Sequence, residues 1–587
     1  MRKLFLTLTM VLTAAWAMAA YYVAGNGTSG NPWCDGLSWV INGSEMEAQG
    51  NGVYSKTFEN VPKGSYQFKV TTGSSWLAAS KFNSSCSNIT CSTLDNIVFM
   101  LSEAQDITIT FDGSKICVQG SKGEAEPDPS EVGVVGVPSE YEGVMLQAFY
   151  WESQKLTTFS CTKYKNLLDS GLADEMGKNF DLVWMPPSGG PTGGGVGYYT
   201  KQYSNLDSDW GTKTKLQELL SKLHSYGCKV LADVVINHFA SSNGWAKNFY
   251  SNNFGSYGTY QISSKYICSG DECFTSASSD SKNLQKGNAD TGTNDGGCRD
   301  LDHTQEYVQN MCKAYTKWLI NTIGFDGFRY DMTLGYAGQY LSMYNLASEP
   351  FFSVSECWSD VTTIANHLKA TNYNTLAFDF PLKEKFNDWK GGEASYSNLK
   401  NPSKSLRSKG LSKNAVTFID NHDTFHRSDN QGAEFLGYNT NISTKKREIV
   451  EANAYLLMMP GVPCVFWPHW YTFKEDINQL IAIRKKAGIH SESKVENETG
   501  LSNKYKATIT GHRAKVFLRM GSQRSTFDVP EGFTLELAGD NFDIYLMEFT
   551  PVENVSVQPA ATKVLEDGKL YIIRDNKRYT VDGRVAE

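Results

Sequence analysis

Four short apolar segments in the middle of the chain end in acidic or imidazole side chains. They are residues 230–238 (VLADVVINH), 325–332 (FDGFRYDM), 351–358 (FFSVSECW) and 416–424 (VTFIDNHDT). A parallel strand that is covered on both faces reads as a continuous run of Val, Ile, Leu and Phe, and each segment has this character. Ionisable side chains are costly at the end of a buried strand unless a site uses them. The segments therefore predict parallel strands whose ends meet at one polar mouth.

These segments are part of a longer alternation of strand and helix patterns. The candidate strands lie at residues 143–150, 180–185, 228–236, 325–331, 351–356, 375–380, 415–420 and 462–467. Most are separated by helical patterns such as residues 213–226 (KTKLQELLSKLHSY). Eight such strands predict a (β/α)8 TIM barrel. The interval at about 239–303 is too long for an ordinary loop, so it predicts an inserted domain B after strand three.

The regions on either side of the barrel contain short strands of alternating polarity with Gly, Asn and Ser between them. The sequence therefore predicts a multidomain protein. In chain order its parts are a signal peptide (1–20), a β-sandwich that could bind carbohydrate (21–119), a linker (120–142), the barrel (143–489), a C-terminal antiparallel β-sheet domain (490–550) and a β-hairpin tail that could be a sorting segment (551–587).

The N-terminus has the pattern of an export signal. Arg2 and Lys3 precede an apolar run that ends near Ala17, with small residues at a cleavage position. The run is too short to span a membrane comfortably, so we expect a secreted or cell-surface protein without a membrane span. The net charge of −8 is mild, and no basic stripe suggests nucleic acid as a partner. We expect a monomer.

Twelve cysteines in an exported chain can be oxidised, although their density is far below that of a disulfide scaffold. The pairs Cys86/Cys91 and Cys268/Cys273 lie in polar loops and are the expected local disulfides. Cys228 and Cys464 lie beside or inside apolar strands, so we expect buried thiols there.

Three carboxylates fall at the expected mouth of the barrel, where active sites of this fold are built. They are Asp331, Glu356 and Asp423, at the ends of strands four, five and seven. Crowded carboxylates repel one another, so at least one should keep its proton above the usual pH. A protonated Glu356 could donate to a leaving oxygen, while Asp331 beside Arg329 could attack an anomeric carbon. This pair of acids is the equipment for glycoside hydrolysis.

The same residues also have ordinary structural interpretations. A single Asp after a strand is usually a helix cap or a turn residue. A lone histidine such as His422 is usually structural, although His238 and His422 are placed to hydrogen-bond a sugar. Capping does not easily explain three acids, an arginine and two histidines at the strand ends of one barrel. We therefore favour a catalytic site.

The four segments resemble the four sequence regions of the α-amylase family of glycoside hydrolases (family 13), especially amylases of the plant and archaeal type. The matching residues are Asp233, Asn237 and His238 in the first region, Arg329 and Asp331 in the second, Glu356 in the third, and His422 and Asp423 in the fourth. The resemblance implies a retaining double displacement on α-1,4-glucans. In that scheme Asp331 is the nucleophile, Glu356 the acid/base and Asp423 the stabiliser of the transition state. Tyr198 would stack on the sugar at the cleavage point.

The resemblance has one departure. The family has a lysine three residues after the nucleophile, which helps to hold sugar on the leaving-group side, and Leu334 occupies that position here. We expect altered binding on that side and intact chemistry.

The resemblance also implies a calcium ion, which prefers several hard oxygen ligands. The implied ligands are side chains of Asn237, Asp290 and Asp300 with the carbonyls of Thr293 and Gly335. On spacing alone, Asp290 could equally be a turn residue. Such an ion would order the loop behind His238 rather than touch the bond being broken.

Starch and maltooligosaccharides are the partners that the resemblance implies. Trp33, Trp39 and Trp76 of the sandwich could stack on sugar, or they could be core residues. For the whole chain we expect an endo-acting, calcium-dependent α-amylase. The alternatives are a 4-α-glucanotransferase or other transglycosylase on the same scaffold, and a non-catalytic starch-binding surface protein. A pure binding protein would gain nothing from three repelling carboxylates.

Overall fold

The computed structural model describes most of the chain between residues 20 and 580. The residues outside the description are 1–19, 90, 94–95, 102–103, 122–134, 156–158, 191–194, 295, 401–403, 426, 428–431, 433–434, 436–441, 550–561, 567–568, 575–576 and 581–587. The expected signal peptide, apart from its last residue, and most of the expected linker therefore lie outside the described residues.

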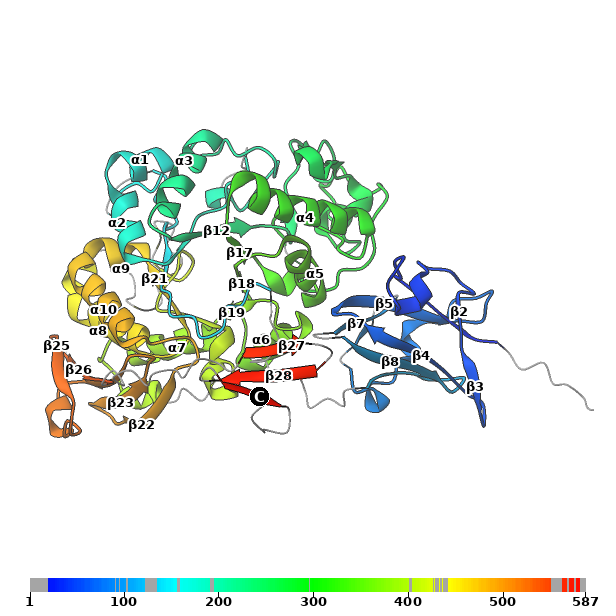
Figure 1. Cartoon of the computed structure of the whole chain (residues 1–587). Helices are drawn as coiled ribbons and strands as arrows, with labels where there is room; N and C mark the ends of the chain where they lie inside the picture. Colours follow the sequence, from blue (N-terminus) through cyan, green and yellow to red (C-terminus); the bar gives the residue numbers. More distant parts are fainter. Residues whose placement is uncertain are drawn as a thin grey trace, which may run out of the picture.

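The N-terminal domain has two antiparallel sheets that share one hydrophobic core (Figure 1). The first sheet contains β2 (Ser44–Glu45), β1 (Tyr22–Gly25), β5 (Gly64–Thr71), β7 (Ile97–Leu101) and β6 (Cys91–Thr93). The second contains β3 (Glu47–Gly50), β4 (Val53–Val61), β8 (Gln105–Phe111) and β9 (Ile116–Gly120). In β8 every second side chain is buried, as expected for a strand with one face on a core.

The tryptophans of this domain have different environments. Trp33 is fully buried, and its ring packs against those of Phe58 and Phe99, so it is a core residue and not a surface binding residue. Trp76 is 44% exposed and lies 6.2 Å from the ring of Trp39. Only the Trp39–Trp76 pair remains a candidate contact for sugar.

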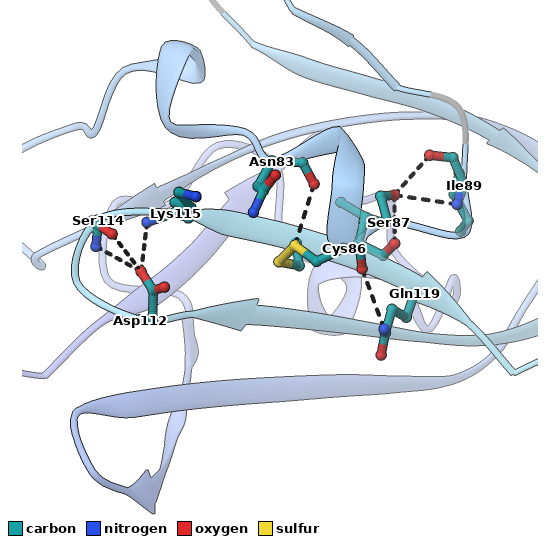
Figure 2. The surroundings of a disulfide bond; sticks show 10 residues. Asn83, Cys86, Ser87, Ile89, Asp112, Ser114, Lys115 and Gln119 are labelled. Atoms are coloured by element: carbon teal, nitrogen blue, oxygen red, sulfur yellow. Dashed lines mark hydrogen bonds between the residues drawn. A yellow bond between two sulfur atoms is a disulfide. The ribbon is translucent and has the colours of Figure 1, made fainter.

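The disulfide of this domain joins Cys86 to Cys117, so the expected Cys86–Cys91 bond is wrong (Figure 2). Cys86 ends a short 3₁₀ helix that packs on β9, where its Cα lies 5.7 Å from that of Cys117. This separation is typical of disulfides. Cys91 instead begins β6 in the other sheet. Sequence proximity is a poor guide here because the sulfur atoms are placed by sheet packing.

The second expected disulfide is wrong as well. Cys268 and Cys273 are both buried thiols. Asp271 lies between them and caps a 3₁₀ helix, η7 (Glu272–Phe274), by accepting a hydrogen bond from the Cys273 N–H. Cys228 and Cys464 are buried thiols, as predicted.

The central domain is a closed barrel of eight parallel strands, which confirms the predicted fold class. Its strands are β10 (Met145–Gln147), β11 (Leu182–Trp184), β12 (Lys229–Val234), β17 (Gly327–Tyr330), β18 (Phe352–Ser355), β19 (Leu376–Phe378), β20 (Ala415–Phe418) and β21 (Val462–Phe466). Almost every residue of these strands is buried, because the barrel interior covers one face and the helices cover the other. Each strand falls within the range that the sequence predicts.

Ten α-helices among the described residues accompany the barrel (Figure 1). They are α1 (Tyr164–Asp169), α2 (Leu172–Asn179), α3 (Lys213–His224), α4 (Glu306–Trp318), α5 (Gly338–Ser348), α6 (Val361–Ala370), α7 (Phe380–Trp389), α8 (Lys446–Met458), α9 (Trp467–Thr472) and α10 (Lys474–Ala487). Helix α3 shows why such a segment forms a helix and packs on the barrel. Thr212 caps it by accepting a hydrogen bond from the backbone of Lys215, and four leucines at helical spacing form its buried face. None of the described helices is both long enough and apolar enough to cross a membrane.

Domain B is inserted between β12 and β17. Its short strands are β13 (His238–Phe239), β14 (Ser251–Asn253), β15 (Thr259–Gln261) and β16 (Arg299–Asp300). β13 and β16 pair antiparallel, with His238 opposite Asp300. The start and the end of the insertion are therefore held together beside the mouth of the barrel.

The C-terminal domain is a five-stranded antiparallel sheet. Its strands, in spatial order, are β22 (Lys494–Gly500), β23 (Tyr505–Thr510), β24 (Ala514–Met520), β26 (Phe542–Glu548) and β25 (Thr534–Ala538). The tail differs from the predicted hairpin. It forms a three-stranded sheet of β27 (Thr562–Glu566), β28 (Lys569–Arg574) and β29 (Lys577–Thr580), in which β28 pairs antiparallel with both of the others.

Candidate active site

A pocket of about 380 Å³ opens at the carboxyl ends of the barrel strands. All three predicted carboxylates line it. The other lining residues are Trp151, Tyr198, Tyr199, His238, Thr293, Gly297, Met332, Leu334, Trp358 and His422. Residues as distant in the chain as Trp151 and Asp423 therefore line one cavity, as the barrel fold requires.

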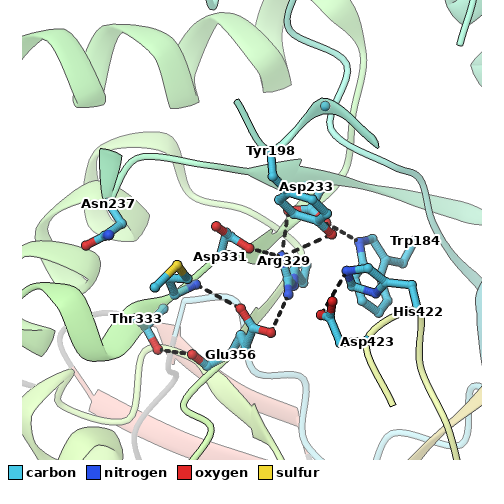
Figure 3. A network of polar contacts seen from close by, with 12 residues as sticks. Trp184, Tyr198, Asp233, Asn237, Arg329, Asp331, Thr333, Glu356, His422 and Asp423 are labelled. Carbon is cyan, nitrogen blue, oxygen red and sulfur yellow. Dashed lines mark hydrogen bonds and ion pairs between the residues drawn. The ribbon is translucent and has the colours of Figure 1, made fainter. Parts of the chain in front are cut away.

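Arg329, at the centre of this site, is almost fully buried (Figure 3). Its Nη1 donates to Asp233 Oδ1 at 2.9 Å and to Asp331 Oδ1 at 2.7 Å. Its Nη2 lies 2.9 Å from Glu356 Oε1. One guanidinium thus holds carboxylates from three neighbouring strands, and the site has more acids than cations. Charge-assisted bonds of this kind fix geometry as well as charge.

Asp233 anchors the arginine and is not among the residues that line the pocket. Besides the bond to Arg329, its Oδ2 accepts hydrogen bonds from the Tyr198 hydroxyl at 2.8 Å and from Trp184 Nε1 at 3.0 Å. Burial raises the pKa of Asp233 to about 7, although Arg329 opposes the shift. Trp184 was not singled out in the sequence; its position at the end of β11 was the available signal.

Glu356 has the properties of a proton donor. Burial, together with the nearby Asp331 and Asp423 carboxylates, raises its pKa to about 8 despite the opposing charge of Arg329. Its Oε2 accepts a hydrogen bond from the backbone N–H of Met332 at 2.9 Å. Met332 has φ = 43°, a left-handed conformation that costs a non-glycine residue about 1–3 kcal/mol. This strained residue directs its N–H at the acid.

Asp423 and His422 face the pocket from the end of β20. Gln147 Nε2 donates to His422 Nδ1 at 2.9 Å, so the ring proton lies on Nε2, which is 3.1 Å from Asp423 Oδ2. Burial lowers the pKa of His422 well below its usual value, so the ring is neutral. Burial also raises the pKa of Asp423, against the charges of Arg329 and Arg427.

Tyr198 and His238 line the pocket on the domain B side. The rings of Tyr198 and His422 are nearly parallel, with centroids 5.3 Å apart. His238 Nε2 donates to the Tyr198 carbonyl at 3.0 Å, and its Nδ1 accepts from Asn237 Nδ2 at 3.3 Å. Both ring nitrogens of His238 therefore bind protein groups, and a sugar hydroxyl would have to share one of them.

The predicted metal ligands converge beside this pocket. A Cβ atom added to Gly335 would lie 1.8 Å from Asn237 Oδ1, so that amide rests directly against the Gly335 backbone. The N–H of Thr293 donates to the Leu334 carbonyl. The β13–β16 pairing places Asp300 near Asn237. In it Asp300 is opposite His238, and the N–H of Leu301 donates to the Asn237 carbonyl.

Asp290 contributes a carboxylate to the same region. Its Oδ1 accepts from the Gly292 N–H at 3.0 Å, while its Oδ2 is buried without a hydrogen-bond partner among the described residues. Burial raises the pKa of Asp290. An unsatisfied buried carboxylate oxygen, an amide oxygen and nearby carbonyls fit a hard cation such as Ca²⁺.

The chain is similar to known proteins of one enzyme family. The family profile "Alpha amylase, catalytic domain" matches residues 175–469. The chain is 30% identical over 424 residues to probable α-amylase 2 of Arabidopsis thaliana, a match that covers 68% of this chain and 93% of that protein. The chain belongs to the α-amylase family of glycoside hydrolases. The family that the sequence regions indicated is thereby confirmed.

Other relatives of this family member support the same assignment. The glucan 1,4-α-maltotetraohydrolase of Stutzerimonas stutzeri is 27% identical over 409 residues, covering 65% of this chain and 68% of that enzyme. A solved α-amylase structure from Geobacillus thermoleovorans, complexed with acarbose, aligns with a TM-score of 0.51 at 15% identity, over 70% of this chain and 99% of that one, which shows a shared fold. A "Pullulanase X25 domain" profile matches residues 40–116 in the N-terminal domain.

Proposed function

We propose that the chain is an α-amylase that hydrolyses internal α-1,4-glucosidic bonds of starch and related glucans with net retention of configuration. The observation that carries the proposal is the single guanidinium of Arg329, which holds Asp331 and Glu356 together beside the pocket. Retaining enzymes need their two carboxyl groups about 5–5.5 Å apart, a spacing that two acids bound to one guanidinium can meet. The named α-amylase and maltotetraohydrolase relatives support this substrate class.

The first step forms a glycosyl–enzyme ester. Asp331, which accepts a hydrogen bond from Arg329, attacks the anomeric carbon as the bond to the leaving oxygen breaks. Glu356 gives its proton to that oxygen. Its raised pKa keeps this proton available near neutral pH, which a carboxyl group in water would not do.

The second step releases the sugar. Glu356, now a carboxylate, takes a proton from water, and the water oxygen replaces Asp331 at the anomeric carbon. Two inversions give net retention. Asp423 has a raised pKa and a bond to the Nε2–H of His422, and it is placed to accept sugar hydroxyls as the ring distorts. Tyr198 presents its ring beside the same position.

We also propose that Asn237, Asp290 and Asp300 bind calcium together with the carbonyls of Thr293 and Gly335. The ion would supply positive charge among these buried oxygens and fasten domain B to the barrel. These residues would thereby hold His238, the neighbour of Asn237, against Tyr198.

A time course of oligosaccharides released from soluble starch tests the main proposal. An endo-acting hydrolase should first produce a broad range of maltodextrins and later short ones. A transglycosylase would build products longer than the substrate when it is supplied with a single maltooligosaccharide. Dominance of such longer products would replace our proposal with the transferase alternative.

A second activity is supported in the N-terminal domain, which we propose binds starch through Trp39 and Trp76. Their ring centroids lie 6.2 Å apart with the planes tilted by 56°, and Trp76 is 44% exposed, so the pair offers apolar ring surface to a sugar chain. The double variant Trp39→Ala/Trp76→Ala should sediment less with insoluble starch while soluble starch is cleaved normally. Unchanged sedimentation would refute this role.

The export signal supports a secreted or cell-surface location for a protein that acts on polymers too large to enter a cell. The N-terminal sequence of the mature protein should then begin near residue 20 or 21. We propose a monomer, which size-exclusion chromatography with light scattering would test.

A further inference from the structure

A group of nitrogen and oxygen donors lies where three parts of the chain meet, away from the pocket. Glu140 precedes β10, His490 follows α10, and His512 lies in the turn between β23 and β24. One donor atom from each side chain lies within 4.8 Å of the other two. Among the residues that the structure describes, no other three His, Cys, Asp or Glu side chains meet this criterion.

Glu142 orients the imidazole of His512. Its Oε1 accepts a hydrogen bond from His512 Nδ1 at 2.8 Å, and Arg513 Nη1 donates to the same oxygen at 3.1 Å. With the proton on Nδ1, His512 Nε2 carries a lone pair, and this atom lies 3.5 Å from Glu140 Oε2. A carboxylate that binds the far nitrogen of a metal-binding histidine is the usual outer partner in zinc sites.

His490 provides the buried part of the group. It is 8% exposed, and its ring lies against that of His512 with centroids 4.2 Å apart. The Glu492 N–H donates to His490 Nδ1 at 3.3 Å, and the ring must give up this bond to bind a metal. The side chains of Glu140 and His512 are 58% and 39% exposed. Tetrahedral zinc with bonds of about 2.0–2.1 Å needs donor atoms about 3.3 Å apart, so the donors must close and the stacked rings must turn edge-on. The two exposed side chains have the freedom to do this.

We propose that Glu140, His490 and His512 form a binding site for a borderline transition-metal ion, with Zn²⁺ as the expected occupant. Two imidazoles and one carboxylate, with water in a fourth position, are a common zinc ligand set. Calcium prefers oxygen ligands alone, so this site is chemically distinct from the one proposed at Asp290 and Asp300.

The position of the site indicates what the ion does. The backbone of His512 donates to the Gly488 carbonyl, so the C-terminal sheet already contacts the end of α10 here. Glu140 and Glu142 lie just before β10, at the amino-terminal end of the barrel and opposite the catalytic mouth. Residues at that end of a barrel serve stability rather than chemistry. A bound ion ties the C-terminal domain to the barrel and stabilises both by mass action.

The test is a calorimetric titration of the full-length protein with Zn²⁺, after transition metals have been removed and with calcium present in excess to occupy the oxygen site. We expect one equivalent to bind, a rise in Tm, and unchanged cleavage of soluble starch. Co²⁺ at the same site should give the strong visible absorption of a tetrahedral complex.

Three variants and a control assign the ligands. His512→Asn keeps a donor for Glu142 but removes the Nε2 ligand, and Glu140→Gln removes the carboxylate. Each should lose most of the Zn²⁺ affinity. Glu142→Gln, which changes only the outer partner, should lose about 10–100-fold. His224→Asn is the matched control, because His224 also binds a carboxylate, Asp326, but lies outside the group. The Zn²⁺ affinity of this variant should equal that of wild type.

Two outcomes would overturn the proposal. One is a wild-type protein that does not bind Zn²⁺. The other is undiminished binding by both His512→Asn and Glu140→Gln in protein that still cleaves starch, and is therefore folded. Either would leave the group as an ion-pair network between domains. Neither outcome bears on the proposed amylase activity, which is measured separately.

Discussion

Glu356→Gln should abolish hydrolysis and at the same time stabilise the protein increasingly as the pH rises. The residue is only 7% exposed and its pKa is raised from 4.5 to about 8 in the folded protein. Below pH 4.5 the acid is protonated in both the folded and the unfolded state, so its titration does not change the free energy of unfolding. Between pH 4.5 and 8 the unfolded state releases this proton more readily, and folded stability falls.

The size of the effect follows from the pKa difference. At about 1.36 kcal/mol per pKa unit, the native acid loses on the order of 4–5 kcal/mol of stability between pH 4.5 and 8. Glutamine carries no such penalty. It also cannot accept from both Arg329 and the Met332 N–H, which costs about 1 kcal/mol at every pH. The variant should therefore be near or slightly below wild type at pH 4.5 and clearly more stable at pH 8.

Scanning calorimetry of both proteins across this pH range measures the difference in Tm of the barrel transition. The conservative variant Glu498→Gln is the control. Glu498 is also a partly buried acid that binds an arginine, Arg407, but it lies away from the mouth of the barrel. Wild-type kcat/KM should also fall above about pH 8, as the proton donor is lost. Parallel Tm curves for wild type and Glu356→Gln would refute the assignment of a raised pKa to this residue.

Further outcomes are expected at other positions. Asp331→Asn should remove nearly all starch hydrolysis, and wild-type products should appear first as the α-anomer in proton NMR; early β-anomer would contradict double displacement. EDTA should lower the Tm of wild type more than that of Asp290→Asn, and equal shifts would argue against a metal at Asp290. Cys117→Ser should destabilise the N-terminal sandwich by about 2–4 kcal/mol in chemical unfolding and leave amylase activity intact. Leu334→Lys should change the lengths of early products without abolishing cleavage, and an identical product pattern would show that this position does not contact the leaving-group side.

The sequence by itself determined the barrel and the identity of the acids. A strand covered on both faces has to be mainly apolar, so β12, β17, β18 and β20 lie in segments rich in Val, Leu, Ile and Phe. Their polar ends are visible for the same reason, because charge at the end of such a run is costly. Local composition therefore placed Asp331, Glu356 and Asp423 at one mouth before any distance was known.

Only the tertiary structure decided what those acids contact. The guanidinium of Arg329 is shared by carboxylates from three different strands, and the raised pKa of Glu356 depends on burial and on charges that are distant in the chain. The same holds for the Cys86–Cys117 bond and for the metal ligands proposed at His490 and His512. Strand patterns are set by interactions along the chain, whereas hydrogen bonds, desolvation and sulfur–sulfur approach depend on distances that only packing creates.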